Sequence, residues 1–102
     1  MMADMQMQVW LDTIAGTRPT VVVPYVKTDH DARLTYRMKV VKAGKSGYSG
    51  INQSGTVSAT AGTPKALSQL SVGLQQGDDC HIDIELLEGG QVRGTYRFEC
   101  PR

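Results

Sequence analysis

The stretch CHIDIELLEGGQVRGTYRFEC, residues 80–100, carries both cysteines of the chain, one at each end. On either side of its EGGQ turn signal, apolar side chains recur at every second position. Such alternation is typical of β-strands that bury one face, so the stretch predicts a hairpin that covers the core. The residues expected to face inward are Cys80, Ile82, Ile84, Leu86, Val92, Tyr96, Phe98 and Cys100.

The inward positions have even numbers on both strands, which restricts the register of this hairpin. A three-residue loop at 89–91 meets the restriction and places Glu88 opposite Val92 and Cys80 opposite Cys100. Opposed Cα atoms lie about 4.5 to 5.5 Å apart, within disulfide range. We therefore expect a Cys80–Cys100 disulfide that stabilises by about 3 kcal/mol and indicates an oxidising compartment. The alternative is two free thiols that both face inward.

QMQVWL and ARLTYRMKVV also alternate, and TVVVPYV, which lies between them in the sequence, is a short apolar run; all three predict further strands. Pro24 within TVVVPYV favours an edge position or a bulge. Residues 44–62 are rich in Gly, Ser and Thr and predict a flexible loop with a weak strand near 56–60. KALSQLSVGL fits either a short helix or a strand, and its neighbours favour the strand. The chain is thus predicted to be all-β: an immunoglobulin-like β-sandwich of about seven antiparallel strands.

The length of 102 residues suits a single domain that spans 1–102. The formal net charge of +1 argues against nucleic-acid binding through global charge. No apolar run approaches the roughly 18 residues that a membrane span requires. The first residues lack the features of a signal peptide, so we expect either a cytosolic protein or a mature chain whose signal has been removed.

Catalytic and metal-binding patterns are not found in the sequence. GKSGYSG lacks the spacing of a phosphate loop. His30 is expected in a solvated turn, and His81 is expected to form a surface charge pair with Asp79 or Asp83. The cysteines and histidines lack the close spacing of zinc ligands. We therefore expect a protein that is not an enzyme and has no cofactor or metal.

The outward positions of three predicted strands carry most of the charge. In an immunoglobulin-like sheet these strands are neighbours, so Asp83 and Glu85 would form an acidic row between two basic rows. The alternative is a solvated face with cross-strand ion pairs, each worth a few tenths of a kcal/mol. Arginine favours the recognition of carboxylates and amides. The candidate binding residues are Arg33, Arg37, Lys39, Arg93 and Arg97.

The order LTYRMKVV, GKSGYSG, ALSQLSVGL, GDDCHIDIEL and EGGQ resembles the curli assembly inhibitors, the CsgC-like periplasmic proteins, and most closely their CsgH branch. The resemblance implies an immunoglobulin-like sandwich in the periplasm of a Gram-negative bacterium. It also implies a chaperone-like inhibitor whose partner is the major curlin amyloid subunit. The enteric branch carries a C-x-C pair on an early strand, but RLTYRMK has no cysteine, so a redox role based on that pair does not carry over.

A charged face suits such an inhibitor, because electrostatic contact is transient and speeds encounter. Pro24, Lys39 and Lys42 are expected to protect sheet edges, so that the inhibitor, expected to be a monomer, does not join the fibre. Two other functions stay open on the sequence alone. One is a secreted structural or adhesive module without chaperone activity, and the other, less favoured, is a thiol–disulfide enzyme.

Overall fold

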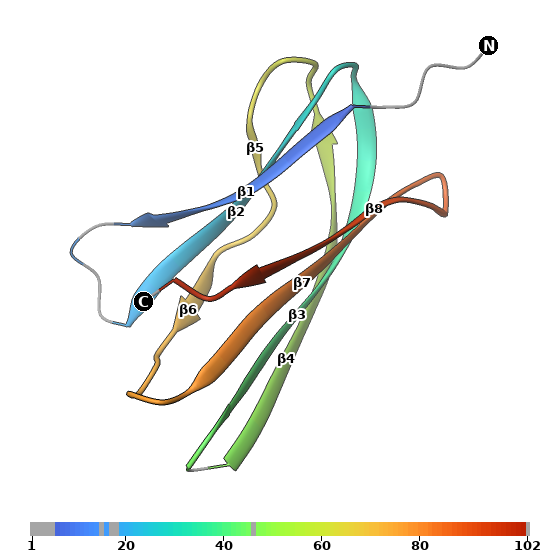
Figure 1. Cartoon of the computed structure of the whole chain (residues 1–102). Coiled ribbons are helices and arrows are strands. Elements are labelled where there is room, and N and C mark those ends of the chain that lie inside the picture. Colours follow the sequence, from blue (N-terminus) through green and yellow to red (C-terminus); the bar gives the residue numbers. More distant parts are fainter. Residues whose placement is uncertain (1–5, 15, 17–18, 46, 102) are drawn as a thin grey trace.

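The fold is a sandwich of two antiparallel sheets, as a computed structural model of the chain shows (Figure 1). The structure describes residues 6–14, 16, 19–45 and 47–101. One sheet has the order β1-β2-β5, with β6 also paired to β2, and the other has the order β4-β3-β7-β8. The strands are β1 Met7–Ile14, β2 Thr20–Thr28, β3 Ala32–Gly44, β4 Gly47–Ala59, β5 Lys65–Ala66, β6 Leu70–Val72, β7 Asp79–Glu88 and β8 Gln91–Glu99. The predicted all-β sandwich is confirmed, with two short strands that raise the count to eight.

The core lies between the two sheets and consists mainly of aliphatic side chains. Alternate residues of β3 and β7 point into it, as the sequence predicted, and Leu34, Ile82 and Ile84 are fully buried. Val22 and Val26 of β2 meet them from the sheet that contains β1, β2, β5 and β6. Complete burial of such a side chain stabilises by roughly 1.5 to 3 kcal/mol, so these alternating rows fix which face of each strand turns to solvent.

The last hairpin has the predicted register along most of its length, with Ile84 opposite Tyr96. The predicted three-residue loop is wrong, because the turn contains only Gly89 and Gly90. Both glycines have positive φ, of 57° and 79°, which suits a two-residue hairpin turn. A bulge next to the turn then restores the register of the remaining residues. As a result Val92 lies opposite Leu87 and not Glu88, and it is 49% exposed and not in the core.

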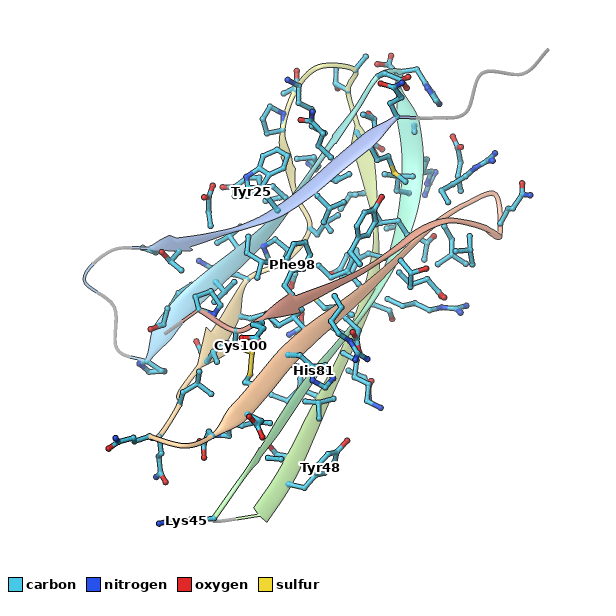
Figure 2. The ribbon with its side chains drawn as sticks, viewed as in Figure 1. Tyr25, Lys45, Tyr48, His81, Phe98 and Cys100 are labelled. Atoms are coloured by element: carbon cyan, nitrogen blue, oxygen red, sulfur yellow. A yellow bond between two sulfur atoms is a disulfide. The ribbon has the colours of Figure 1, made fainter. Side chains whose placement is uncertain are left out.

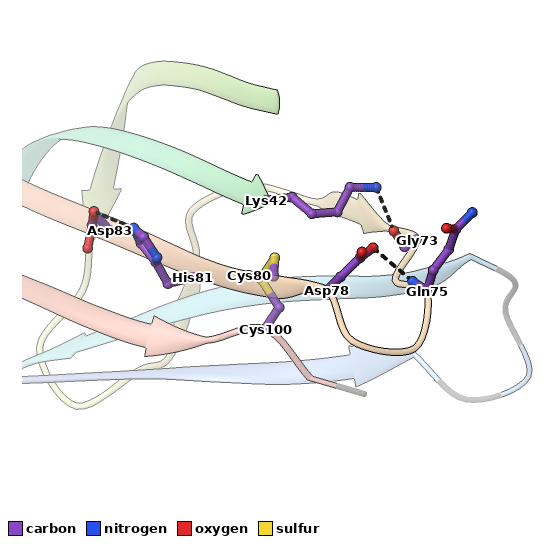
Figure 3. Close-up of a disulfide and its surroundings, with 8 residues drawn as sticks. All are labelled: Lys42, Gly73, Gln75, Asp78, Cys80, His81, Asp83 and Cys100. Atoms are coloured by element: carbon purple, nitrogen blue, oxygen red, sulfur yellow. Dashed lines mark hydrogen bonds and ion pairs between the residues drawn. A yellow bond between two sulfur atoms is a disulfide. The ribbon is translucent and has the colours of Figure 1, made fainter. Parts of the chain in front are cut away.

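The expected disulfide is confirmed: Cys80 and Cys100 are bonded, with their Cα atoms 5.3 Å apart. The Cys100 N–H also donates to the Cys80 carbonyl at 3.1 Å, just beyond the end of β8. Figure 3 shows two nearby hydrogen bonds that hold the preceding loop, from Lys42 Nζ to the Gly73 carbonyl and from the Gln75 N–H to an Asp78 carboxylate oxygen. The bond therefore closes the open end of the hairpin.

The segment 44–62, predicted as a flexible loop with a weak strand near 56–60, instead contains the whole of the long strand β4. Its register with β3 continues without a shift from Ala32↔Ala59 to Gly44↔Gly47. The inward positions of β4 include glycine and glutamine, so the apolar alternation that marks the other strands is weak here. Tyr36 covers Gly55, the residue directly opposite it, so that an aromatic ring occupies the space that a larger inward side chain would fill.

Pro24 is not on an edge strand, because β2 pairs with β1 on one side and with β5 and β6 on the other. The partner strand is interrupted between Ala66 and Leu70, and Pro24 lies beside this gap. There its carbonyl accepts a hydrogen bond from the Leu67 N–H at 2.8 Å. The missing proline N–H therefore breaks no ladder hydrogen bond.

The predicted edge protection by lysine is also wrong. Lys39 and Lys42 lie on β3, which has β4 on one side and β7 on the other. KALSQLSVGL, predicted as a strand, forms the two short strands β5 and β6 with a connecting segment between them.

Candidate functional site

The outward side chains of β4, β3, β7 and β8 form one continuous face, here called the charged face. Strand register sets its rows, because residues directly opposite one another lie side by side across the sheet. The two central rows, written from β4 to β8, are Asn52–Lys39–Asp83–Arg97 and Ser54–Arg37–Glu85–Thr95. Across the strands, the predicted order is present: the acidic residues of β7 lie between the basic residues of β3 and β8. Beyond β3, the outward residues of β4 in these two rows are polar and uncharged.

Ion pairs connect the acidic strand to the basic strands on both sides. Arg97 donates to Asp83 through two hydrogen bonds, Nε to Oδ1 at 2.7 Å and Nη2 to Oδ2 at 3.2 Å. On the other side, Arg37 Nη1 lies 3.3 Å from Glu85 Oε1. The cross-strand ion pairs expected in the alternative interpretation are therefore present at Arg37 and Arg97. Both arginines remain largely exposed, so each pair is worth less than about 1 kcal/mol.

The ionisation of Asp83 reflects this arrangement. The hydrogen bond from Arg97 lowers the pKa of Asp83 below its ordinary value of 3.8, and the positive charges of Arg97, His81 and Lys39 add to the effect against partial burial. The same contact raises the pKa of Arg97 above its ordinary value. His81 Nε2 lies 3.5 Å from Asp83 Oδ2, which confirms the predicted surface charge pair. Asp83 therefore stays charged at neutral pH.

Two cations of the charged face differ from the others. Arg33 lies opposite Ser58, and Lys39 lies between Asn52 and Asp83. Within the described part of the chain, neither Arg33 nor Lys39 has an ion-pair partner within 4.0 Å. A partner can therefore approach both charges without breaking a direct ion pair.

A shallow hollow of about 660 Å³ covers both central rows. Its lining includes Arg37, Lys39, Asn52, Asp83 and Arg97. The hollow crosses all four strands on an open sheet surface, whereas small-molecule sites are usually concave clefts that bury most of the ligand. The arrangement suits contact with another chain.

Arg93, the fifth predicted binding residue, is not in this constellation. It lies in the bulge of β8, where its Nε is 3.3 Å from Glu88 Oε1. Its side chain lines a different hollow, together with Met7, Thr28 and Tyr96, beside the ends of β1 and β2. The structure therefore brings four of the five predicted residues to the charged face and separates Arg93 from them.

The outward residues of β4 were not predicted, because most of this segment was expected to be a flexible loop. Tyr48 is one of these residues and is 68% exposed, near the end of the β3–β4 hairpin (Figure 2). Asn52 and Ser54 extend the central rows across β4. One sequence feature could have indicated this strand: residues 47–59 contain no charged residue and no proline. The feature is weak, because a loop can have the same composition.

The described residues contain no group of three or more histidine, cysteine or acidic side chains that could hold a metal ion. His30, predicted in a solvated turn, is exposed and pairs only with its neighbour Asp29 at 2.7 Å. No helix in the described segments is long and apolar enough to cross a membrane.

Comparison with known proteins places these features in a family. The sequence matches the Tafi-CsgC family, described as thin aggregative fimbriae synthesis protein, over residues 1–97. This chain belongs to the Tafi-CsgC family. The predicted resemblance to the CsgC-like proteins is therefore confirmed, and the family gives this Tafi-CsgC protein a curli-related role.

Two solved structures share the Tafi-CsgC fold seen here. The E. coli curli protein CsgC is 22% identical, with a TM-score of 0.77 over 91% of this chain and 98% of its own. R. palustris CsgH is 16% identical, with a TM-score of 0.72 over 92% of both chains. A comparison with curated proteins gave no match. At these identities the two structures support the fold of the sandwich and not the roles of single residues.

Proposed function

We propose that this protein is a periplasmic, chaperone-like inhibitor that binds early species of the major curlin subunit and delays amyloid formation before export. The family match over 1–97 is the observation that carries the proposal. The charged face supports it, because this face offers cations in register on a rigid sheet. The Cys80–Cys100 disulfide is consistent with an oxidising compartment such as the periplasm.

The contact with the client is electrostatic and transient. Arg33 and Lys39 meet client carboxylates or amides first, since no internal ion pair has to break. Arg37 and Arg97 can exchange their internal partners for client groups at a cost of a few tenths of a kcal/mol each. Charge steering raises the rate of encounter, so a small amount of inhibitor can meet many client molecules during the lag phase. The activity requires no cofactor and no turnover.

The proposal is tested with purified major curlin subunit and thioflavin-T fluorescence, with this protein well below a one-to-one ratio. A long delay at low salt that shortens at high salt is expected, because the Debye length falls from about 30 Å at 0.01 M to about 3 Å at 1 M. No delay at any salt concentration would reject the proposal and favour a structural module without chaperone activity.

A pair of variants tests the assignment of the face. Arg33→Gln with Lys39→Gln removes the two cations without an internal ion pair and is expected to shorten the delay strongly. Arg93→Gln with Lys65→Gln removes the same amount of charge away from the charged face and is expected to preserve the delay. Equal inhibition by both variants, with the fold intact, would show that the charged face is not the binding surface.

A further inference from the structure

Strand β4 is an edge strand without the usual protection against pairing. Among the described strands it pairs with β3 alone. Its 13 residues, GYSGINQSGTVSA, include no charged side chain and no proline, and its register with β3 has no bulge. Natural proteins usually protect edges with charges, prolines, bulges or short strands, so this edge is able to accept another strand.

The other described edges each carry such a device. β8 has the bulge opposite Leu86 and Leu87 and presents Arg97 and Glu99 along its length. β1 carries Asp12 in its second half. β5 and β6 are only two and three residues long. Protection of three edges and not of β4 distinguishes this strand within the fold.

Only part of the β4 edge is open. In the middle of the strand, Gln53 Oε1 accepts a hydrogen bond from Ser68 Oγ at 2.6 Å, so the segment between β5 and β6 packs against the inward face of β4 there. Residues 47–52 belong to the β3–β4 hairpin, which projects past the rest of the sandwich (Figure 1). Ile51, on the inward face of this half, is 51% exposed. The open part therefore offers one free edge and space on both faces.

The backbone of 47–52 points the required groups outward. Only two residues separate the paired Gly44 and Gly47, and the pair that closes a two-residue hairpin is hydrogen-bonded. Hydrogen-bonded and non-hydrogen-bonded pairs alternate along antiparallel strands. The N–H and C=O groups of Tyr48, Gly50 and Asn52 consequently point away from β3, toward the free edge.

We infer that residues 47–52 of β4 accept an extended, uncharged segment rich in Gly, Ser, Asn and Gln by β-strand addition. The identity of that segment as a client strand rests on the proposed function. An added strand would lie two strand spacings, about 10 Å, from β3. The cations of β3, Lys39 above all, therefore favour amide side chains on the outward positions of the added strand.

A second copy of this chain suits the edge less well. Pairing of two β4 edges would join two sheets and bring the basic rows of both β3 strands, with Arg33, Arg37 and Lys39 in each, to opposite sides of the same junction. Like charges across such a junction oppose association. Each copy would also bring its own β5–β6 segment, which lies beside β4 at Gln53. A single client strand brings neither obstacle.

Amide hydrogen exchange measured by NMR on the isotope-labelled full chain, with monomeric major curlin subunit added during its lag phase, tests the inference. The amides of Tyr48, Gly50 and Asn52 are expected to exchange about tenfold more slowly with the client present. Those of Ser49 and Ile51 already bond to β3 and are expected to change little. Unchanged exchange at all three outward amides, while thioflavin-T shows a delay, would overturn the inference that the client binds at the β4 edge. It would leave the proposed function intact.

Two edge-blocking variants give a second test. Ile51→Lys places a charge on the inward face of the edge, and Gly50→Pro removes one outward N–H. Both are expected to shorten the thioflavin-T delay severalfold, whereas Thr13→Lys, which adds the same charge as Ile51→Lys to edge strand β1, is expected to preserve it. Urea unfolding identifies any variant that has lost its fold, and such a variant is set aside in favour of the other.

Four outcomes are distinguishable. Shortened delays with folded edge variants support the inference, and inhibition equal to that of Thr13→Lys overturns it. The inference is also overturned if the three outward amides exchange more slowly without client and the effect grows with the protein's own concentration. A second copy of the chain would then occupy the edge. Absence of any delay with the unmodified protein rejects the proposed function itself.

Discussion

The guanidinium of Arg97 holds the carboxylate of Asp83 through two hydrogen bonds across adjacent strands of the charged face. This contact keeps Asp83 ionised because it lowers the pKa of that carboxyl group. A group whose pKa is lower in the folded state contributes stability above its unfolded pKa and loses it as the pH falls through the folded pKa.

The stabilisation by this pair is therefore expected to be present at neutral pH and to disappear in acid. At pH 7, Arg97→Gln is expected to reduce the free energy of unfolding only slightly, because solvent screens this exposed ion pair. The difference from the unmodified protein should shrink as the pH falls below about 4. Urea unfolding at several pH values measures it, and a constant difference across that range would contradict the assigned ion pair.

Gly55→Ala is expected to destabilise the protein by about 1 to 3 kcal/mol, as overpacking does. A Cβ atom at this position would lie 2.9 Å from the ring and the hydroxyl of Tyr36, which is held in the core. Gly50→Ala on the same strand is the matched control, because its Cβ would meet no atom closer than 3.9 Å. Thermal unfolding compares the two, and equal stabilities would show that the Tyr36 ring moves aside easily.

Removal of the disulfide by Cys80→Ala with Cys100→Ala is expected to cost about 3 kcal/mol, because the bond closes a loop of about 20 residues in the unfolded chain. A reductant should lower the stability of the unmodified protein by a similar amount and leave the double variant unchanged. Guanidinium unfolding with and without reductant gives both values. A double variant as stable as the oxidised protein would show that the bond is dispensable for the fold.

Thr28→Val is expected to stabilise the protein by about 1 kcal/mol. Thr28 is buried, and its hydroxyl oxygen has no hydrogen-bond partner among the described residues. Valine keeps the shape and removes the unsatisfied group. Thr35→Val serves as control, because Thr35 is more exposed and its hydroxyl lies 3.4 Å from that of Thr56. A loss of stability in Thr28→Val would mean that water reaches this hydroxyl through the adjoining hollow.

The sequence was sufficient where alternation is strongly apolar. Leu34, Ile82 and Ile84 have clear period-two spacing, and this spacing predicted the core, the outward acidic row and the cysteine pairing. The outward direction of Arg37 and Arg97 followed from the same parity. Such features are local, since each strand carries enough apolar residues to fix its own buried face.

The errors arose where tertiary contacts replace local signals. Gly55 fits a strand because Tyr36 from the neighbouring strand covers it, and nothing near Gly55 in the sequence shows this. Pro24 fits an interior strand because it lies beside the interruption between β5 and β6. Its hydrogen-bond partner there, Leu67, is 43 residues further along the chain. Arg93 does not lie on the charged face, because the bulge in β8 interrupts the alternation from which its outward direction was predicted.

The sheet β4-β3-β7-β8 has two unequal edges, because β8 carries a bulge and half of β4 is open. In the language of polymer chemistry, the proposed inhibitor has a functionality of one: it can take up a strand at β4 and offers no second site at β8. A unit with one reactive end terminates a growing chain and cannot link two chains. By the same reasoning, a rise in its own concentration adds more terminators and builds no polymer.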